Sequence, residues 1–208
     1  MTRLYAGLAA GAVAALLGGS VWFVYSQQTD NLFASCQGGQ IGGGDIGGAF
    51  TLVDETGATV TDAQVLTKPS LVYFGYTYCP DVCPIDSSRN AEAVDILEQK
   101  GLDVQPVLIT IDPDRDTPEV LAEYTANLHP RMIGLTGSAE QIKTASLAYK
   151  TYYKKQAGAD YLMDHSTFTY LMLPGIGFAD FFGREVTAQA MADRVACFVT
   201  AAGGRASN

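Results

Sequence analysis

The sequence predicts an α/β fold, a mixed β-sheet flanked by helices, preceded by one N-terminal transmembrane helix. Three observations lead to this prediction. A long uncharged apolar run opens the chain, strand-like apolar runs alternate with helical patterns from about residue 50, and a hairpin and a helix close it. A βαβ start with a ββα finish is the thioredoxin arrangement, and its functional groups should gather at the carboxyl ends of the parallel strands.

The apolar run extends from Leu4 to Tyr25 and contains no charged residue. At about 1.5 Å per residue it would span roughly 33 Å, close to the thickness of a bilayer core. Arg3 precedes the run, and no Lys or Arg follows until Lys68. The positive-inside rule therefore predicts an uncleaved anchor over residues 1–25, in a bacterial inner membrane with the rest of the chain in the periplasm.

Three further segments follow the anchor. Residues 26–49 are polar and glycine-rich, which is typical of a flexible tether. We expect the folded domain over residues 50–202 and a short tail over 203–208. The formal net charge of −9 argues against nucleic acid as a partner, since nucleic-acid binding needs clustered Lys and Arg.

Short apolar runs of strand length recur through the domain, at 50–53, 58–60, 70–74, 107–111, 133–135, 167–173 and 178–182. The runs at 70–74 and 107–111 are almost continuously apolar, as in strands that are buried on both faces. Pro174–Gly177 joins the last two runs into a hairpin.

Helical patterns separate these strands, at about 83–100, 117–128, 138–149 and 188–200. Gly101 ends the first helix, and Thr117 with Pro118 begins the second. Ser138 is expected to cap the third helix.

The segment with the clearest chemistry is Phe74–Pro84, FGYTYCPDVCP, between a buried strand and a helix. Cys79 and Cys83 are four residues apart, so on a helical turn they would share a face. Such a pair forms a disulfide or holds one metal ion, and a helix N-terminus should make both thiols ionise more easily than free cysteine. Thioredoxin-type redox motifs separate their cysteines by two residues rather than three, which weakens the redox interpretation without removing it.

The chain has two histidines. We expect His129, before Pro130 at a helix end, to be a surface residue. His165 lies just before the 167–173 strand, and the thioredoxin-like topology would place it beside Cys79 and Cys83. Two thiolates and one imidazole suit copper as Cu(I) or Cu(II), whereas structural zinc would require a fourth Cys or His. Asp164 or water is a candidate fourth ligand for Cu(II).

Two other groups of residues are candidates for a structural or metal-binding role. The acidic run Asp112–Asp116 resembles a calcium loop, but Thr117 occupies the position that needs glycine and a helix follows, so we expect the run to border the metal site instead. Cys36 and Cys197 are remote from the motif. In an oxidising compartment two remote thiols tend to pair, which predicts a disulfide between the tether and the last helix.

Three motifs together resemble the Sco/SenC family: residues 73–84 around the cysteine pair, residues 111–118 (IDPDRDTP), and Asp164–Ser166. The resemblance covers about residues 50–200. It implies a copper chaperone that binds copper through Cys79, Cys83 and His165. It also implies a role in building the dinuclear copper centre of cytochrome c oxidase subunit II, by delivering copper, reducing its cysteines, or both. The Pro174–Gly177 turn is more apolar than the acidic turn expected of the family.

Two alternatives use the same cysteine pair. The domain would be a thiol-disulfide oxidoreductase if Cys79 and Cys83 cycle through a reversible disulfide, or a copper or redox sensor if it signals to a membrane partner. A periplasmic copper donor or thiol reductant is an expected partner in each case.

Overall fold

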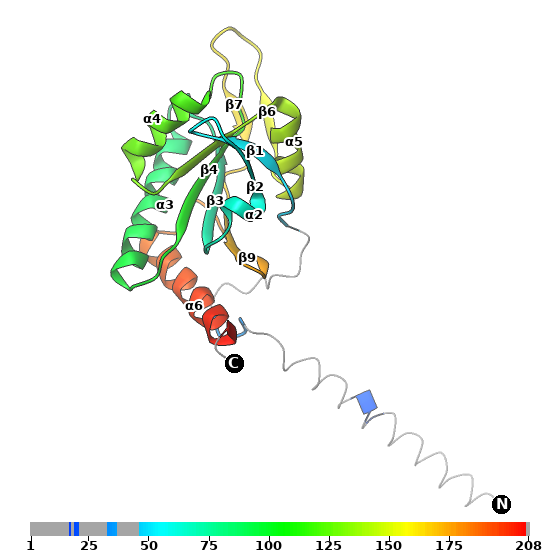
Figure 1. The fold of residues 1–208 in the computed structure, drawn as a ribbon, viewed down its shortest axis with the longest axis vertical. Helices are drawn as coiled ribbons and strands as arrows, with labels where there is room; N and C mark the ends of the chain where they lie inside the picture. The colour runs from blue at the N-terminus through cyan, green and yellow to red at the C-terminus, as the bar shows by residue number, and fades with distance from the viewer. Residues whose placement is uncertain (1–16, 18, 21–32, 37–45, 207–208) are drawn as a thin grey trace, which may run out of the picture.

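The computed structural model describes residues 17, 19, 20, 33–36 and 46–206, and it builds one main sheet and one small sheet from them (Figure 1). The main sheet has seven strands in the order β2-β1-β5-β4-β3-β8-β9. Their bounds are Thr59–Thr61 (β2), Thr51–Asp54 (β1), Ile133–Thr136 (β5), Gln105–Thr110 (β4), Ser70–Gly75 (β3), Thr169–Leu173 (β8) and Gly177–Phe182 (β9). The small sheet pairs β6 (Tyr153–Lys155) with β7 (Met163–His165). The described helices of the domain are α2 (Asp62–Val65), α3 (Val82–Gln99), α4 (Pro118–Leu128), α5 (Ala139–Ala148) and α6 (Ala188–Ala206).

The strand directions bring several loops to one end of the sheet. Strands β3, β4 and β5 are parallel, and Gly75 at the end of β3 pairs with Thr110 at the end of β4. Strand β8 is antiparallel to β3, so Thr169, where β8 begins, pairs with Tyr73. The loops after β3 and β4 and the segment before β8 therefore meet at the same end, as the predicted thioredoxin-like topology requires.

Strand β3 shows how the two faces of the sheet are covered. All six of its residues are buried, and successive side chains point to opposite faces. Leu71 packs with α3 and α6, whereas the Phe74 ring lies 5.2 Å from the Tyr149 ring at the end of α5. Helices thus cover both faces (Figure 1). Burying one such side chain contributes about 1.5–3 kcal/mol.

The helix starts agree with the capping residues expected from the sequence. The Thr117 hydroxyl accepts a hydrogen bond from Val120 N at 3.4 Å, and Pro118 occupies the first helical position of α4. Ser138 and Gln141 form a reciprocal capping box at the start of α5. Because these caps satisfy N–H groups that have no partner inside the helix, they fix where each helix begins.

A disulfide joins Cys36 to Cys197 on α6. The Phe33 ring packs beside the Phe198 ring, with 4.9 Å between centroids, and Phe33 and Cys36 are both buried against α6. This short segment, residues 33–36, is therefore part of the folded domain and lies at the end opposite the loops after β3 and β4 (Figure 1).

Two features of the structure differ from the sequence-based expectations, and one expectation falls mostly on residues that the structure does not describe. Helix α6 continues to Ala206, past the expected end at Thr200, and neither α2 nor the small β6–β7 sheet was expected. The expected anchor over residues 1–25 lies outside the described residues except for Leu17, Gly19 and Ser20, which are helical. Among the residues that the structure describes, no helix has the length and apolar character needed to cross a bilayer.

Candidate metal centre

Cys79, Cys83 and His165 come together at the end of the sheet where the loops meet. One potential ligand atom from each residue lies within 4.8 Å of the other two. Cys79 is in the loop after β3, Cys83 is in the first turn of α3, and His165 is the last residue of β7. The three residues that the sequence singled out as ligands are therefore close enough to hold one metal ion.

Cys79 lies just before α3, where the helix presents N–H groups that have no partner within the helix. Cys83 N donates a hydrogen bond to Cys79 Sγ at 3.3 Å. Burial raises the pKa of the Cys79 thiol, but hydrogen bonds from the backbone N–H groups of Asp81 and Cys83 outweigh it, so the pKa is lowered. Cys79 is also only partly buried, which makes it the accessible thiolate of the pair.

Cys83 differs from its partner. Its side chain is fully buried, and burial raises the pKa of its thiol above the ordinary value, with the neighbouring Cys79 adding to the effect. The expectation that both thiols ionise easily is therefore wrong for Cys83, because desolvation of the second position exceeds the stabilisation by the helix N-terminus. Both cysteines are free thiols in the structure.

His165 presents its ring nitrogen to the buried thiol. His165 Nε2 lies 3.4 Å from Cys83 Sγ, and Nδ1 lies 2.8 Å from the carbonyl oxygen of Ser166. The carbonyl assigns the proton to Nδ1 in the neutral ring, which leaves the Nε2 lone pair facing the cysteines. Burial lowers the pKa of His165, against the opposing effect of the Ser166 carbonyl, and so favours this neutral, ligating form.

Two buried side chains near Cys83, Tyr73 and Asp86, were missed by sequence reasoning. Tyr73 OH donates to Asp86 Oδ2 at 3.2 Å, and Arg184 Nε lies 3.5 Å from the same carboxylate. A Cβ on Gly75 would lie 2.7 Å from the Tyr73 ring and 3.2 Å from Cys83 Sγ, so this position requires glycine. The spacing of Cys83 and Asp86 on α3 was the available sequence signal, because residues i and i+3 share a helix face.

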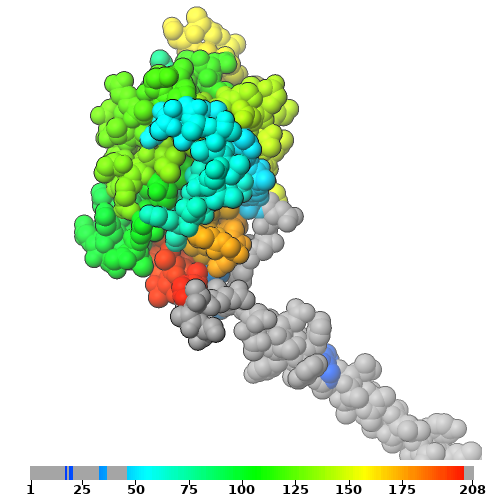
Figure 2. All heavy atoms as spheres, in the orientation of Figure 1, coloured from blue at the N-terminus to red at the C-terminus, as the bar shows by residue number. Residues whose placement is uncertain are grey.

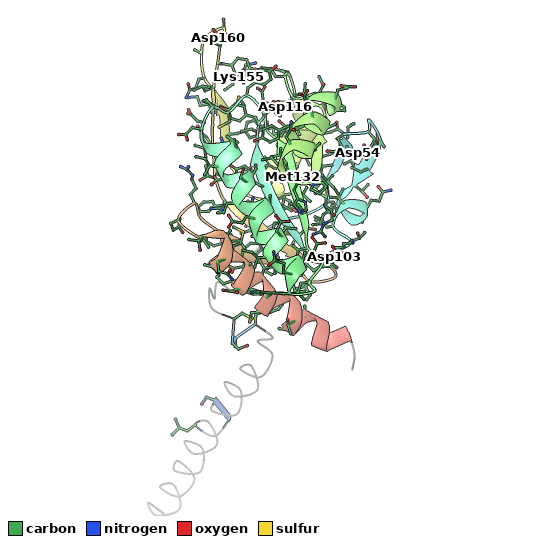
Figure 3. The ribbon with its side chains drawn as sticks, turned by 90° about the vertical axis from the view of Figure 1, so that its left-hand side faces the viewer. Asp54, Asp103, Asp116, Met132, Lys155 and Asp160 are labelled. Atoms are coloured by element: carbon green, nitrogen blue, oxygen red, sulfur yellow. A yellow bond between two sulfur atoms is a disulfide. The ribbon has the colours of Figure 1, made fainter. Side chains whose placement is uncertain are left out.

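The acidic run 112–116 lies in the loop after β4, at the end of the sheet that carries the metal centre, and Figure 3 labels Asp116 in this loop. Asp116 is fully buried and accepts hydrogen bonds from Thr77, at 2.6 Å from the hydroxyl and 3.1 Å from the backbone N–H. These bonds attach the Cys79 loop to the loop after β4. They also engage both carboxylate oxygens of Asp116 within the protein, which agrees with a structural role.

Neither of two other residues that the sequence singled out, His129 and Asp164, is a member of the ligand cluster. His129 is 5% exposed, with Nε2 3.3 Å from Asp95 and Nδ1 accepting from Arg131 N, so the expectation of a surface histidine is wrong. Its position between α4 and β5 turns the ring inward. Asp164 is exposed, and Gln156 donates to its Oδ1 at 2.7 Å; it is not one of the clustered ligands.

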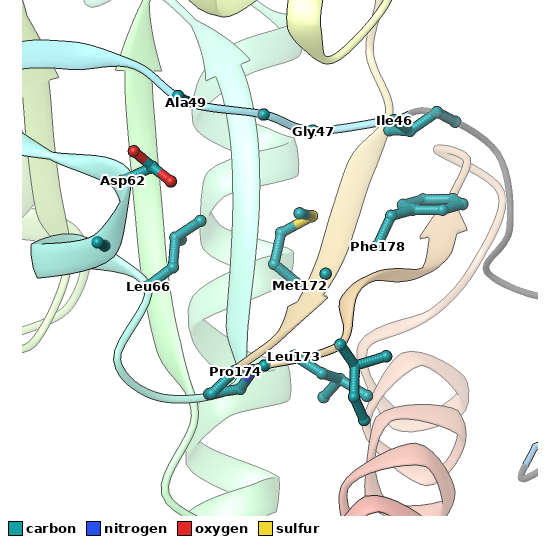
Figure 4. Close-up of a pocket in the computed structure, with 14 residues that line it drawn as sticks. Ile46, Gly47, Ala49, Asp62, Leu66, Met172, Leu173, Pro174 and Phe178 are labelled. Carbon is teal, nitrogen blue, oxygen red and sulfur yellow. The ribbon is translucent and has the colours of Figure 1, made fainter.

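The metal centre is reached from a cleft of about 390 Å³ lined by Cys79, Pro80, Leu162 and His165 among others. The loop between β6 and β7 projects beyond this end of the domain (yellow in Figure 2). A second pocket, of about 700 Å³, opens at the opposite end of the sheet between residues 46–49 and the Pro174–Gly177 turn (Figure 4). Because Cys79 lines the first cleft, a partner is able to reach the ligands directly.

Fold and site together define a thioredoxin-like domain that carries a Cys-Cys-His metal-binding cluster at the end of its sheet. A model of the family described as SCO1/SenC matches residues 38–200. Protein SenC of Rhodobacter capsulatus is 54% identical over 196 residues, which cover 93% of this chain and 89% of that protein. The chain therefore belongs to the SCO1/SenC family, and the resemblance noted in the sequence is confirmed.

Solved structures agree with this assignment. Arabidopsis thaliana ScoI with copper bound is 41% identical, has a TM-score of 0.71, and covers 76% of this chain and 99% of its own. Yeast Sco1 with copper bound is 38% identical, has a TM-score of 0.70, and covers 78% of this chain and 94% of its own. Two structural relatives thus hold the metal that the ligand types of this site favour.

Proposed function

We propose that this protein binds one copper ion through Cys79, Cys83 and His165 and delivers it to the dinuclear copper centre of cytochrome c oxidase subunit II. The observation that carries the proposal is the approach of two sulfurs and one imidazole nitrogen within 4.8 Å. Soft sulfur ligands in low coordination suit Cu(I), and the imidazole extends the set toward Cu(II). The copper-bound relatives support it, and so does the description of the Sco family as cytochrome c oxidase assembly proteins.

The different accessibility of the two cysteines is consistent with delivery of copper to an acceptor. Cys79 is partly exposed at an open cleft, whereas Cys83 is buried. An acceptor thiolate would therefore approach the metal from the Cys79 side and displace Cys79 first. Copper then passes through a state that donor and acceptor ligands share, and Cys83 and His165 release it last.

The proposed location is the periplasmic side of a bacterial inner membrane, with the domain held by the apolar segment 4–25. The uncharged apolar run and the arginine before it support this orientation. A disulfide between Cys36 and Cys197 is also what an oxidising compartment favours.

The test is to measure copper bound by the purified reduced protein and its variants. The wild type should bind one equivalent, and replacing both Cys79 and Cys83 by serine should abolish tight binding. Mixing two equivalents of the copper-loaded protein with copper-free subunit II domain, followed by one-electron oxidation in air, should then produce the visible absorption of a mixed-valence dinuclear copper centre. A double serine variant that retained one tightly bound copper would contradict the proposed site.

A thiol-disulfide exchange role is the second candidate. It is favoured by the asymmetry of the pair, an accessible thiol of lowered pKa followed by a buried thiol of raised pKa. In such an exchange the Cys79 thiolate would attack a partner disulfide, and Cys83 would resolve the mixed disulfide. Reductase activity that persists in His165→Ala would support this role, and activity that requires bound copper would oppose it.

A further inference from the structure

Arg115 lies at the centre of a cluster of tyrosine rings beside the metal centre. Its guanidinium carbon is 3.8 Å from the ring centroid of Tyr161, 4.7 Å from that of Tyr78 and 5.9 Å from that of Tyr76. Arg115 Nε donates to Asp112, whose side chain is only 2% exposed. A guanidinium over ring faces is attracted by the ring quadrupole, and its planar shape suits stacking better than an ammonium group does.

The rings around Arg115 belong to the two segments that carry the metal ligands. Tyr76 and Tyr78 are in the loop that leads to Cys79. Tyr161 is in the β6–β7 arm, residues 153–165, which ends at His165. Arg115 itself belongs to neither segment, since it lies in the loop between β4 and α4.

Hydrogen bonds also join the β6–β7 arm to residues around Arg115. Tyr161 OH donates to Asp112 Oδ1 at 2.8 Å, and Met163 N donates to Tyr76 OH at 3.2 Å. The Tyr76 ring also meets the His165 ring edge-on, with 5.8 Å between centroids and an angle of 85°. The cysteine loop and the histidine arm thus contact each other through the rings and carboxylate that surround Arg115.

We infer that Arg115 is a positioning residue, which sets the distance between His165 and the cysteine pair by joining the β6–β7 arm to the Cys79 loop. The inference rests on the proposed copper site. Arg115 touches no metal ligand among the hydrogen bonds and ring contacts of the described residues, so its effect on copper is exerted through Tyr76 and Tyr161. Without it the arm would keep its fold but hold His165 less firmly over the cysteines.

The test compares Arg115→Gln with the matched control Lys155→Gln. Lys155 also lies over the Tyr161 ring, at 3.9 Å, but it is half-exposed and its ion pair is with exposed Asp114 rather than with Asp112. Cu(I) affinity is measured by competition with a chelator, beside the thermal unfolding of each variant. Arg115→Gln should weaken Cu(I) binding about 10- to 100-fold, the usual cost of losing support for a ligand, and Lys155→Gln should leave it unchanged.

A double-mutant cycle with His165→Ala separates positioning from a general loss of structure. If Arg115 acts through His165, then Arg115→Gln should cost less than about threefold in copper affinity once His165 is already alanine. The EPR spectrum of the Cu(II) form of Arg115→Gln should also broaden toward that of His165→Ala. Arg115→Lys, which keeps the charge and loses the planar stack, should fall between the wild type and Arg115→Gln.

Several results would overturn the inference. Equal losses from Arg115→Gln in the presence and absence of His165 would show that it does not act through the histidine, and so would unchanged affinity in a stably folded Arg115→Gln. If Arg115→Gln failed to fold, Tyr161→Ala would test the same connection from the arm, with the same expected loss. A wild type that bound no copper would overturn the proposed function and this inference together, whereas normal wild-type binding with unaffected variants would overturn the inference alone.

Discussion

Cys83 Sγ lies 3.4 Å from His165 Nε2, although 82 residues separate the two in the chain. The approach follows from strand directions, because β3 ends and β8 begins at the same end of the sheet. One ligand pair is therefore local in sequence, and the third ligand is brought to it by the topology.

The two cysteines should react at different pH values. In the reduced, metal-free protein, iodoacetamide should modify Cys79 with a half-maximal rate below pH 9.0, the ordinary thiol pKa, because its pKa is lowered. Cys83 should react only at higher pH, since burial raises its pKa. Mass spectrometry of peptides from a pH series measures this, with Cys79→Ser as the control. Earlier modification of Cys83 than of Cys79 would contradict the assignment.

Copper binding should resist mild acid because of His165. Protonation of Nε2 competes with the metal, and burial lowers the pKa of His165 below its ordinary 6.5. The affinity advantage of the wild type over His165→Ala should therefore persist at pH 6.5 and disappear as the pH falls further. Chelator competition across a pH series measures that ratio, and an advantage already lost above pH 6.5 would be inconsistent with the buried ring.

Gly75→Ala should disturb the metal centre from behind. Its Cβ would lie 2.7 Å from Tyr73 and 3.2 Å from Cys83 Sγ, so the thiol or the ring must move. We expect a loss of about 1–3 kcal/mol in the free energy of unfolding, together with weaker copper binding. Gly203→Ala is the control, because its Cβ meets no atom within 4 Å and the position is helical. Denaturant unfolding measures the free energy of unfolding of both variants. Equal values for Gly75→Ala and Gly203→Ala would argue against the close contact at Gly75.

Loss of the Cys36–Cys197 disulfide should affect stability and leave copper binding unchanged. The bond closes a loop across 161 residues, and removing it by Cys36→Ser with Cys197→Ser should cost about 2–4 kcal/mol. The metal centre lies at the other end of the domain, so copper stoichiometry and affinity should stay at the wild-type level. Guanidinium unfolding and chelator competition on the same preparation measure the two quantities. A copper affinity that fell with the disulfide would reveal coupling between the two ends.

Much of the fold was predictable because its elements carry strong local signals. The apolar runs at β3 and β4 and the caps at Thr117 and Ser138 each predict a boundary that the structure contains. The β6–β7 arm carried no such signal, since β6 is a three-residue strand with two exposed lysines. It is specified by tertiary contacts, among them the bond from Met163 N to Tyr76 OH.

The convergence of Cys79, Cys83 and His165 was predictable from the sequence, and their environment was not. Spacing identified the cysteine pair, and topology with the family resemblance identified His165. The contrast between the two thiols depends on how deeply each is buried, which four residues of spacing do not encode. The inward position of His129 was missed for the same reason, because a helix-end histidine before proline looks solvent-facing until neighbouring elements are packed around it.

The Cys36–Cys197 disulfide limits how far the proposed copper site is able to move from the proposed membrane anchor. In the proposed topology and without the disulfide, the chain that leads from Tyr25 to the domain would run to Ile46, where the main described segment begins, and at full extension it would reach roughly 70 Å. Attachment at Cys36 shortens this connecting segment to roughly 37 Å. Because the explored volume scales with the cube of the reach, the effective concentration of the site near a membrane-bound acceptor would rise roughly sevenfold. Reduction of this one disulfide, far from the metal centre, would then lower the local concentration of the proposed copper site without altering its copper affinity.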